Sequence, residues 1–269
     1  MKLNDFYALL NEVAPKTISD EFCAKCNGYD NSGILVDCGE ELVGALFTLD
    51  LTNAAIEKAL AIGANVIVTH HPAIYGKIGN IRVDDGALLG GKLVKCLRNG
   101  ISVVSMHLNL DMVDGGVDES LMEGVCIASG TENKQNVEVM HLLETGGYGR
   151  AYDVEETKLC DLVDNMKNIF RSQRIVSYGA ADKKITRAAS FCGAGGDEAA
   201  VAFAKKQGAD VIISSDFKHH VITWAVESGL AVIALTHYAS ENYGFEKYCK
   251  KIRQQAKIPC AFHTDIELL

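Results

Sequence analysis

The feature that most constrains the fold of this chain is an internal repeat of one strand-helix-strand unit. The segment GALFTLDLTNAAIEKALAIGANVIVTHH from Gly44 aligns without a gap with ASFCGAGGDEAAVAFAKKQGADVIISSD from Ala189, at an offset of 145 residues. Strand-helix-strand sequences can match by chance. The shared Gly-Ala turn followed by a matching apolar strand favours duplication, and a duplicated unit predicts a duplicated architecture.

Both copies contain the same predicted elements. The first copy predicts a strand at 45–49, a helix at 54–62 between the N-cap Thr52 and the terminating Gly63, and a strand at 66–69. The second predicts a strand at 189–192, a glycine turn, a helix at 198–207 and a strand at 211–214. A helix and a further strand follow each copy, the strands at 101–106 and 230–236.

This alternation predicts an α/β fold made of two similar halves with mainly parallel sheets. We place the halves at residues 1–130 and 131–269, with the C-terminal segment able to pack back on the first half. The polar segment at 124–137 contains the turn residues expected of a boundary. After it we predict a strand at 137–143, a helix at 157–170 and, near the end, a helix at 240–252.

The composition of the chain favours some functions and cellular locations over others. The chain has 269 residues and a formal net charge of -9, which argues against a general nucleic-acid-binding surface and fits a site for divalent cations. The N-terminus does not resemble a signal peptide, and no long apolar run predicts a membrane span. The nine cysteines are scattered and odd in number, which favours reduced thiols and a cytoplasmic location. Cys23 and Cys26 have the spacing of a zinc knuckle but lack two further nearby ligands.

Residues able to bind metals or move protons collect where the predicted strands end. Ligands of α/β proteins bind beyond the carboxyl ends of parallel strands. Six of the eight histidines lie at four such ends, together with acidic and amide residues: His70, His71, His107, Asn109, Asp111, Asp216, Lys218, His219, His220, His237 and Glu241. A single histidine is more often structural, but this concentration indicates a functional site.

Spacing suggests which of these side chains face the same way. A doublet such as His70-His71 can serve one site only where its strand is ending. We expect His107, Asn109 and Asp111 to alternate along an extended segment and so to share a face. His237 and Glu241, four residues apart, would share a face if a helix begins here. The turn with Gly193, Gly195 and Gly196 can bind phosphate, with Lys218 nearby, or can simply be tight.

Five segments together resemble a known family. They are YDNSG from Tyr29, VTHHPAIYG from Val68, HLNLDMVDGGVDESL from His107, SSDFKHH from Ser214 and THYASE from Thr236. They are similar, in the same order, to the dinuclear-metal family called GTP cyclohydrolase 1 type 2, or NIF-three-like. The family usually has tryptophan at Tyr29, glycine at Ser215 and threonine at Leu108.

The resemblance implies two α/β domains with two divalent metals in the cleft between them. It implies that the metal ligands are His70, His71, Asp111, His237 and Glu241. His107, His219 and His220 would surround the cleft as candidate catalytic residues. The mixture of nitrogen and carboxylate ligands suits zinc, iron or manganese. The resemblance also implies a homo-oligomer, a ring-shaped hexamer.

Two classes of function remain open from the sequence. The first is a metal-dependent hydrolase acting on a small molecule, with GTP or a related nucleotide as a candidate, because paired metals activate water. The second is a non-catalytic oligomeric metal-binding or scaffold protein, since a structural and a catalytic cluster can use the same ligands. The sequence does not distinguish them, and it does not identify the metal.

Overall fold

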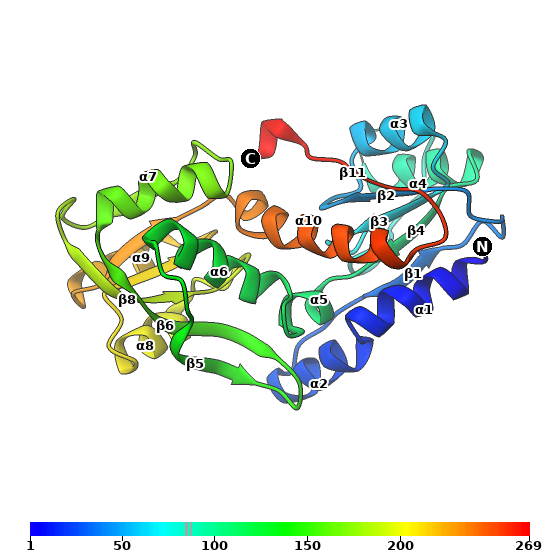
Figure 1. Cartoon of the computed structure of the whole chain (residues 1–269). Coiled ribbons are helices and arrows are strands. Elements are labelled where there is room, and N and C mark those ends of the chain that lie inside the picture. Colours follow the sequence, from blue (N-terminus) through cyan, green and yellow to red (C-terminus); the bar gives the residue numbers. More distant parts are fainter. Residues whose placement is uncertain (84–85, 87) are drawn as a thin grey trace. The chain divides into compact units, whose positions relative to one another are not determined.

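A computed structural model of the chain describes residues 1–83, 86 and 88–269 (Figure 1). Two compact units account for the described chain. The first contains Met1–Val113 and Phe245–Asp265, and the second contains Asp114–Gly244 and Ile266–Leu269. Each unit has its own sheet with helices on its faces, so the predicted α/β class is confirmed.

The first unit is built on a five-stranded sheet in the order β1-β4-β3-β2-β11. Strands β2, β3, β4 and β11 are parallel and β1 is antiparallel to β4. The strands are β1 (Gly33–Val36), β2 (Ala45–Thr48), β3 (Val66–Thr69), β4 (Ser102–Ser105) and β11 (Cys260–Phe262). The helices are α1 (Leu3–Val13), α2 (Lys16–Cys26), α3 (Asn53–Ile62), α4 (Leu89–Arg98) and α5 (Leu108–Met112).

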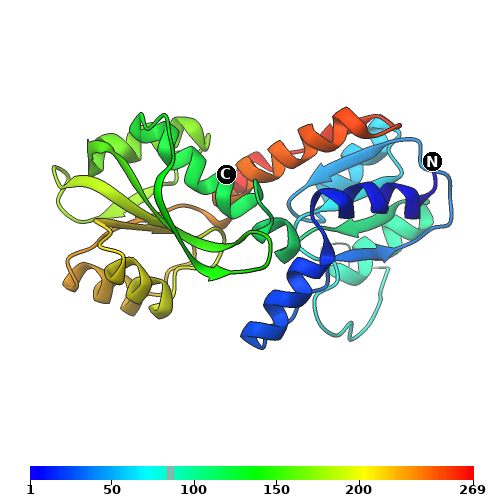
Figure 2. The same ribbon diagram turned by 60° about the horizontal axis from the view of Figure 1, so that its bottom comes forward.

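Helices cover both faces of this sheet, which explains why every residue of β2, β3 and β4 is buried. Helices α3 and α4 pack on one face, where Ile56 and Leu93 join Ile67 in one apolar cluster. On the other face, Phe47 contacts two aromatic residues of α10, and Tyr248 of α10 donates a hydrogen bond to Leu10 of α1. Figure 2 shows α1 in blue and this end of α10 in orange beside the sheet.

The second unit is built on a six-stranded sheet in the order β5-β6-β8-β9-β10-β7. Strands β8, β9 and β10 are parallel at its centre, and β5, β6 and β7 join it antiparallel. The strands are β5 (Gln135–Leu142), β6 (Gly147–Lys158), β7 (Val176–Tyr178), β8 (Lys184–Ser190), β9 (Val211–Ser214) and β10 (Ala231–Ala234). The helices are α6 (Val117–Ser129), α7 (Leu159–Ile169), α8 (Glu198–Lys206) and α9 (His219–Glu227). Helix α10 (His237–Gln255) begins in this unit, and its residues from Phe245 onward belong to the first unit. A short 3-10 helix, η1 (Ile266–Leu268), ends the chain.

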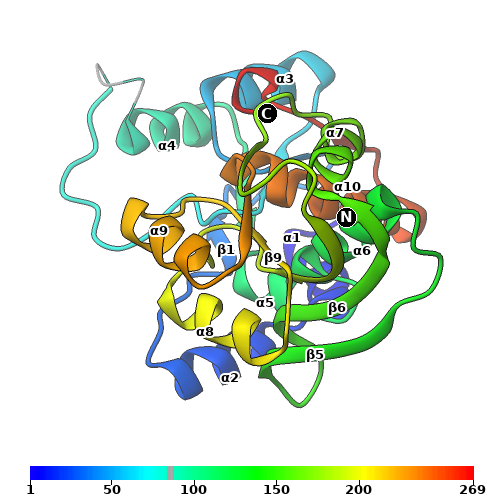
Figure 3. The same cartoon turned by 90° about the vertical axis from the view of Figure 1, so that its left-hand side faces the viewer.

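Helices α8 and α9 pack on one face of this second sheet, through a cluster that includes Val201, Val221 and Ile212. Helix α6 packs against β6 and against α7 (Figure 3). The side chain of Asp118 on α6 accepts hydrogen bonds from the backbone of Gly149 and Cys192. These contacts place α6 in the second unit, although the sequence-based division puts residues 117–129 in the first half.

The repeated strand-helix-strand unit is present in both units. The turns Gly63-Ala64 and Gly208-Ala209 match, and both glycines have a φ of 70°. The ungapped alignment is shifted at the first strand, however, because Ala45 lies opposite Val66 whereas Ala188 lies opposite Val211. The connection in the second unit is therefore two residues longer. The glycine turn after β8 accommodates the extra length.

Other predicted elements agree with the structure except at some boundaries. Strands β3 and β9 have the predicted bounds, Thr52 caps α3 through Ala55, and α8 begins at the predicted Glu198. The predicted helix at 157–170 begins later, because 157–158 complete the long strand β6. Helix α10 begins at His237, before the predicted 240. No helix in the described part of the chain has the length and apolar character required to cross a membrane.

Candidate metal centre

His70 and Asp111 form the centre of a polar cluster at the carboxyl ends of β3 and β4 in the first unit. His70 follows β3 directly and its side chain is fully buried. Its Nδ1 atom lies 2.8 Å from the carbonyl oxygen of Met106, so it donates a hydrogen bond there. Its Nε2 atom then lies 3.3 Å from Oδ1 of Asp111. The ring is oriented by the backbone and directs Nε2 at a carboxylate.

His71 belongs to the same cluster. Its ring centroid lies 5.0 Å from that of His70, and the two rings offer nitrogens within 4.8 Å of each other. Nδ1 of His71 lies 2.8 Å from Oδ1 of Asp50, which follows β2. The two histidines of the doublet thus bring ring nitrogens close together at the end of their strand.

The segment that carries His107, Asn109 and Asp111 is helical, which corrects the predicted extended alternation. His107 precedes α5, and the backbone N–H of Asp111 bonds the carbonyl of His107. A helix places residues four apart on one side. His107 and Asp111 both approach His70, whereas the amide of Asn109 donates to Ala14 and accepts from Ser32. Asn109 is therefore a structural residue of the first unit.

His107 has a carboxylate partner of its own, Asp30. Nδ1 of His107 lies 2.8 Å from Oδ1 of Asp30, and the hydroxyl of Ser32 donates to the other Asp30 oxygen. Burial raises the pKa of Asp30, but the hydrogen bonds from His107 and Ser32 outweigh burial and lower it to about 2. The ring of His107 lies 5.5 Å from that of His70 and 5.9 Å from that of His71.

In the second unit, His237 and Glu241 occupy the first turns of α10. Nε2 of His237 lies 3.2 Å from Oε1 of Glu241, and the predicted spacing of four on a helix accounts for this pairing. Nδ1 of His237 lies 2.5 Å from Oδ2 of Asp216, which follows β9 at a φ of 53°. Burial lowers the pKa of His237, but the carboxylates of Glu241 and Asp216 outweigh burial and raise the pKa to about 9. Surroundings that stabilise an imidazolium cation also favour a metal cation.

The glycine turn after β8 seats Glu241. Gly193 has a φ of 55°, and a Cβ atom there would overlap Oε1 of Glu241 and lie 3.3 Å from Nε2 of His237. A Cβ at Gly195 would overlap the hydroxyl of Tyr148, and one at Gly196 the ring of Phe217. Close packing against these side chains explains all three glycines, so the turn needs no phosphate to account for it.

Hydrogen bonds hold this turn in place on every side. Cys192 donates its N–H to Asp118, and its carbonyl accepts from the hydroxyl of Tyr148 at 2.6 Å. Gly193 donates its N–H to the hydroxyl of Ser240 at 3.1 Å. Because the turn is fixed, the space that it leaves for the carboxylate of Glu241 is fixed as well.

The buried carboxylate of Asp118 holds the start of the turn by accepting a hydrogen bond from the backbone of Cys192. It accepts from both Cys192 and Gly149, and it forms an ion pair with the buried guanidinium of Arg150. Burial raises the pKa of Asp118 to about 6, while Arg150 and the backbone donors act against that rise.

One arrangement recurs at the four histidines His70, His71, His107 and His237. In each, Nδ1 is held by a carboxylate or a carbonyl oxygen. Such partners fix the ring and tautomer of a metal-ligating histidine and leave Nε2 as the metal-binding nitrogen. In His70 and His237, Nε2 faces the carboxylate of a predicted ligand. The residues present therefore fit divalent metal ions.

Sequence reasoning placed Asp216 at a strand end of the site but missed the partners Asp30 and Asp50 as functional residues. It also missed Cys192, whose sulfur lies within 4.8 Å of a Glu241 oxygen. A signal existed for each missed residue, since Asp50 and Cys192 follow strand ends and Asp30 lies in the conspicuous YDNSG segment. The candidate metal-binding residues are thus His70, His71 and Asp111 in the first unit, and Cys192 and Glu241 in the second.

The other predicted catalytic residues, His219 and His220, lie on the first turn of α9 and are exposed. Nε2 of His220 lies 2.8 Å from Oε1 of Glu198 on α8. Among the described residues, no group of three potential metal ligands includes Cys23 or Cys26, which lie on α2.

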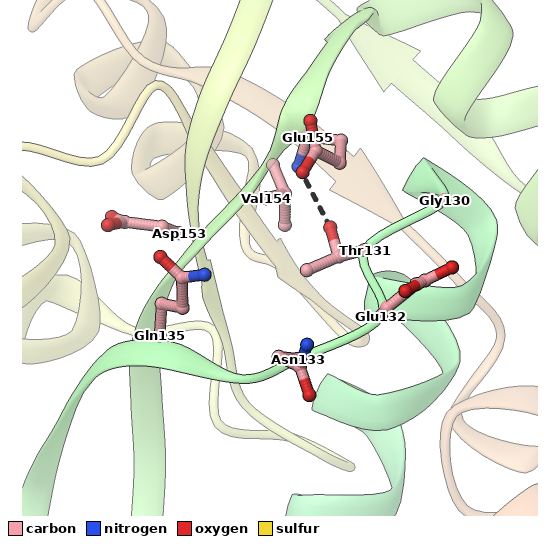
Figure 4. Close-up of a pocket in the computed structure, with 8 residues that line it drawn as sticks. All are labelled: Gly130, Thr131, Glu132, Asn133, Gln135, Asp153, Val154 and Glu155. Atoms are coloured by element: carbon pink, nitrogen blue, oxygen red, sulfur yellow. Dashed lines mark hydrogen bonds between the residues drawn. The ribbon is translucent and has the colours of Figure 1, made fainter.

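A pocket of about 350 Å³ in the second unit is lined by other residues than these (Figure 4). Its lining contains no predicted ligand or catalytic histidine. The carboxylate of Asp153 is bonded by Arg187 and Asn136, and Thr131 accepts from the backbone N–H of Glu155. The lining residues are Gly130, Thr131, Glu132, Asn133, Gln135, Asp153, Val154 and Glu155.

Comparison with known proteins decides the family. Residues 1–267 match the family Duf34/NIF3 (NGG1p interacting factor 3). The chain belongs to the Duf34/NIF3 family. The resemblance inferred from the motifs is confirmed over almost the whole chain.

Relatives of similar length support this assignment. The chain is 31% identical to the GTP cyclohydrolase 1 type 2 homolog of Clostridium acetobutylicum, over 90% of this chain and 85% of that protein. It is 27% identical to NGG1-interacting factor 3 of Saccharomyces cerevisiae, over 84% and 83%. The fold matches a Staphylococcus aureus hypothetical protein with a TM-score of 0.82 at 22% identity, over 99% and 97%. It also matches reduced HcgD from Methanocaldococcus jannaschii, with a TM-score of 0.76 at 23% identity, over 97% of both chains.

Proposed function

We propose that this Duf34/NIF3 protein binds two divalent metal ions and acts as a metal-dependent hydrolase on a small molecule. The observation that carries the proposal is a pair of matching arrangements, one in each unit. In the first, His70 faces Asp111, and in the second, His237 faces Glu241. In both arrangements a further oxygen holds Nδ1 of the histidine, which suits a metal site better than a structural histidine.

The proposed ligand set is His70, His71, Asp111, His237 and Glu241. Zinc, iron and manganese all accept such nitrogen and oxygen donors. Charge supports two ions rather than one. Asp111 and Glu241 offset two positive charges, and the carboxylates of Asp50 and Asp216 behind the ligand histidines offset two more.

Metal ions in such a set supply Lewis-acid chemistry that lowers the pKa of water and offsets negative charge developing on a substrate. The residues of the chain would position and move protons. Because Asp30 holds Nδ1 of His107, Nε2 is the atom that can accept and return a proton beside His70 and His71. His219 and His220 are proposed for the same role, from their place after β9.

GTP is the first substrate to test, because relatives carry the name GTP cyclohydrolase 1 type 2 homolog. Hydrolytic opening of the guanine imidazole ring consumes one water molecule per GTP. We expect the metal-loaded protein to convert GTP into a product heavier by one water, as measured by mass spectrometry. Chelated protein and Asp111→Ala are the controls. A non-catalytic metal-binding or scaffold role is favoured instead if metal is bound but GTP and related nucleotides are returned unchanged.

We also propose a homohexamer located in the cytoplasm. The assembly rests on the family resemblance. Light scattering that gives a monomer at micromolar concentration would refute it. The location is supported by nine cysteines that form no disulfide in the structure. Thiol titration of freshly unfolded protein without reductant should therefore find nearly all nine, and a shortfall of two or more would contradict a reducing compartment.

A further inference from the structure

Two exposed tyrosines lie beside the histidine cluster of the first unit. Tyr29 follows α2 and is 54% exposed, and Tyr75 lies in the segment after His71 and is 58% exposed. Their ring centroids are 5.4 Å apart, with the ring planes at 69°. Edge-to-face contact of this kind covers part of one ring and leaves aromatic surface open to a ligand.

The two rings are held rather than merely adjacent. The hydroxyl of Tyr75 donates a hydrogen bond to the backbone carbonyl of Tyr29 at 3.2 Å. The side-chain amide of Asn31 donates to the carbonyl of Ile74 at 2.7 Å. These two bonds join segments more than forty residues apart in the sequence, the two segments that carry the aromatic pair. Fixed rings bind a ligand with less loss of side-chain freedom than mobile ones.

A continuous series of ring contacts leads from this pair to the proposed metal ligands. The centroid of Tyr75 lies 6.3 Å from that of His107, with the planes at 83°. His107 in turn contacts the rings of His70 and His71. A flat group bound against Tyr75 would therefore lie next to the candidate proton-transfer histidine.

We propose that Tyr29 and Tyr75 bind the planar heteroaromatic ring of the substrate and place it beside His107. This inference rests on the proposed hydrolase function and assigns the residues that select the substrate class. Aromatic side chains bind any flat unsaturated ring through its faces, whereas saturated sugars or phosphates gain little from them. The class is therefore nucleobase-like compounds rather than simple sugar phosphates.

The test measures ring binding and metal content separately. Isothermal titration calorimetry would compare guanosine 5′-monophosphate with ribose 5-phosphate, which lacks the ring, on metal-loaded and on chelated full-length protein. The variants are Tyr29→Leu, Tyr75→Leu and Tyr75→Phe. The matched control is Tyr178→Leu, an exposed tyrosine on β7 of the second unit. Elemental analysis of every sample reports the metal content.

We expect the wild type to bind the nucleotide and not the sugar phosphate. Tyr29→Leu and Tyr75→Leu should each weaken binding about tenfold, the usual size for loss of one stacking ring. Tyr75→Phe should lose less, because the ring remains, and Tyr178→Leu should bind like the wild type. Metal content should be the same in all variants, because none of the replaced residues is a proposed ligand.

Equal nucleotide binding by the wild type and both leucine variants would overturn the inference. So would equal binding of the sugar phosphate, or a changed oligomeric state in Tyr75→Leu with unchanged nucleotide binding, which would make the pair an interface between copies. The proposed function can fail separately. If the wild type holds no metal but still binds the nucleotide, and Tyr75→Leu binds it more weakly, the metal centre is refuted and the aromatic site stands.

Discussion

Oε1 of Glu241 occupies the space that a methyl group on Gly193 would need. The carboxylate can lie there only because residue 193 has no side chain. The turn cannot move away, since the N–H of Gly193 is bonded by Ser240 and its carbonyl by Ser214 and Ser215. A glycine of the predicted turn thus determines the position of a predicted metal ligand.

Replacing Gly193 with alanine should therefore remove metal binding by displacing Glu241. The positive φ adds a cost of about 1 kcal/mol to folding. Gly208→Ala is a matched control, because Gly208 has a φ of 70° and no atom within 4 Å of a built Cβ. We expect similar melting temperatures for the two metal-free variants and metal loss only in Gly193→Ala. Full metal content in Gly193→Ala would show that Glu241 is not a ligand.

Removing the proposed carboxylate ligands should cost metal affinity more than removing an exposed histidine. Asp111→Ala and Glu241→Ala each delete an oxygen donor and a negative charge, whereas His219→Ala changes an exposed residue at the start of α9. Metal content and the rise in melting temperature on adding metal are the measurements. If the first two variants keep both metals while His219→Ala loses them, the ligand assignment is wrong.

The sequence predicts the repeated unit and its ends well, because strand length, helix caps and glycine turns depend on neighbouring residues. Val66–Thr69 and Val211–Ser214 are strands with the predicted bounds, and Gly63 ends its helix as expected. Such local signals do not show which distant strand joins a sheet. The long strand β6 and its antiparallel pairing with β5 were accordingly not predicted.

The partners behind the histidines were missed for a similar reason. Asp50 lies 21 residues from His71, and Asp30 lies 77 residues from His107. A carboxylate becomes a partner only when the fold brings it to a ring nitrogen. Alternation also misled the interpretation of His107 to Asp111, because residues four apart share a side in a strand and in a helix alike. Only Asn109, between them, distinguishes the two conformations.

The carboxylates of Asp50 and Asp216, which hold Nδ1 of His71 and His237, should matter to metal binding although neither is a proposed ligand. Asp216→Asn and Asp50→Asn keep the size of the side chain but remove the charge that holds Nδ1–H of His237 and His71. Loss of such a partner typically lowers metal affinity about 10- to 100-fold. Glu198→Gln is the matched control, since Glu198 pairs in the same way with His220, which is no proposed ligand. Competition with a chelator of known affinity measures the change, and equal losses in all three variants would contradict the arrangement.

Asp30 should make the stability of the protein depend on acid pH. Its hydrogen bonds with His107 and Ser32 lower its pKa from 3.8 to about 2 despite burial, so the unfolded chain binds its proton first as pH falls. The stabilisation is therefore complete above about pH 5 and is lost as the pH falls toward 2. This lowering of the Asp30 pKa corresponds to about 2 kcal/mol of folding stability. Urea unfolding of wild type and Asp30→Asn from pH 6 to pH 2 tests this. The stability difference between the two proteins should shrink by about that amount toward low pH, and a constant difference would show that Asp30 has an ordinary pKa in the folded protein.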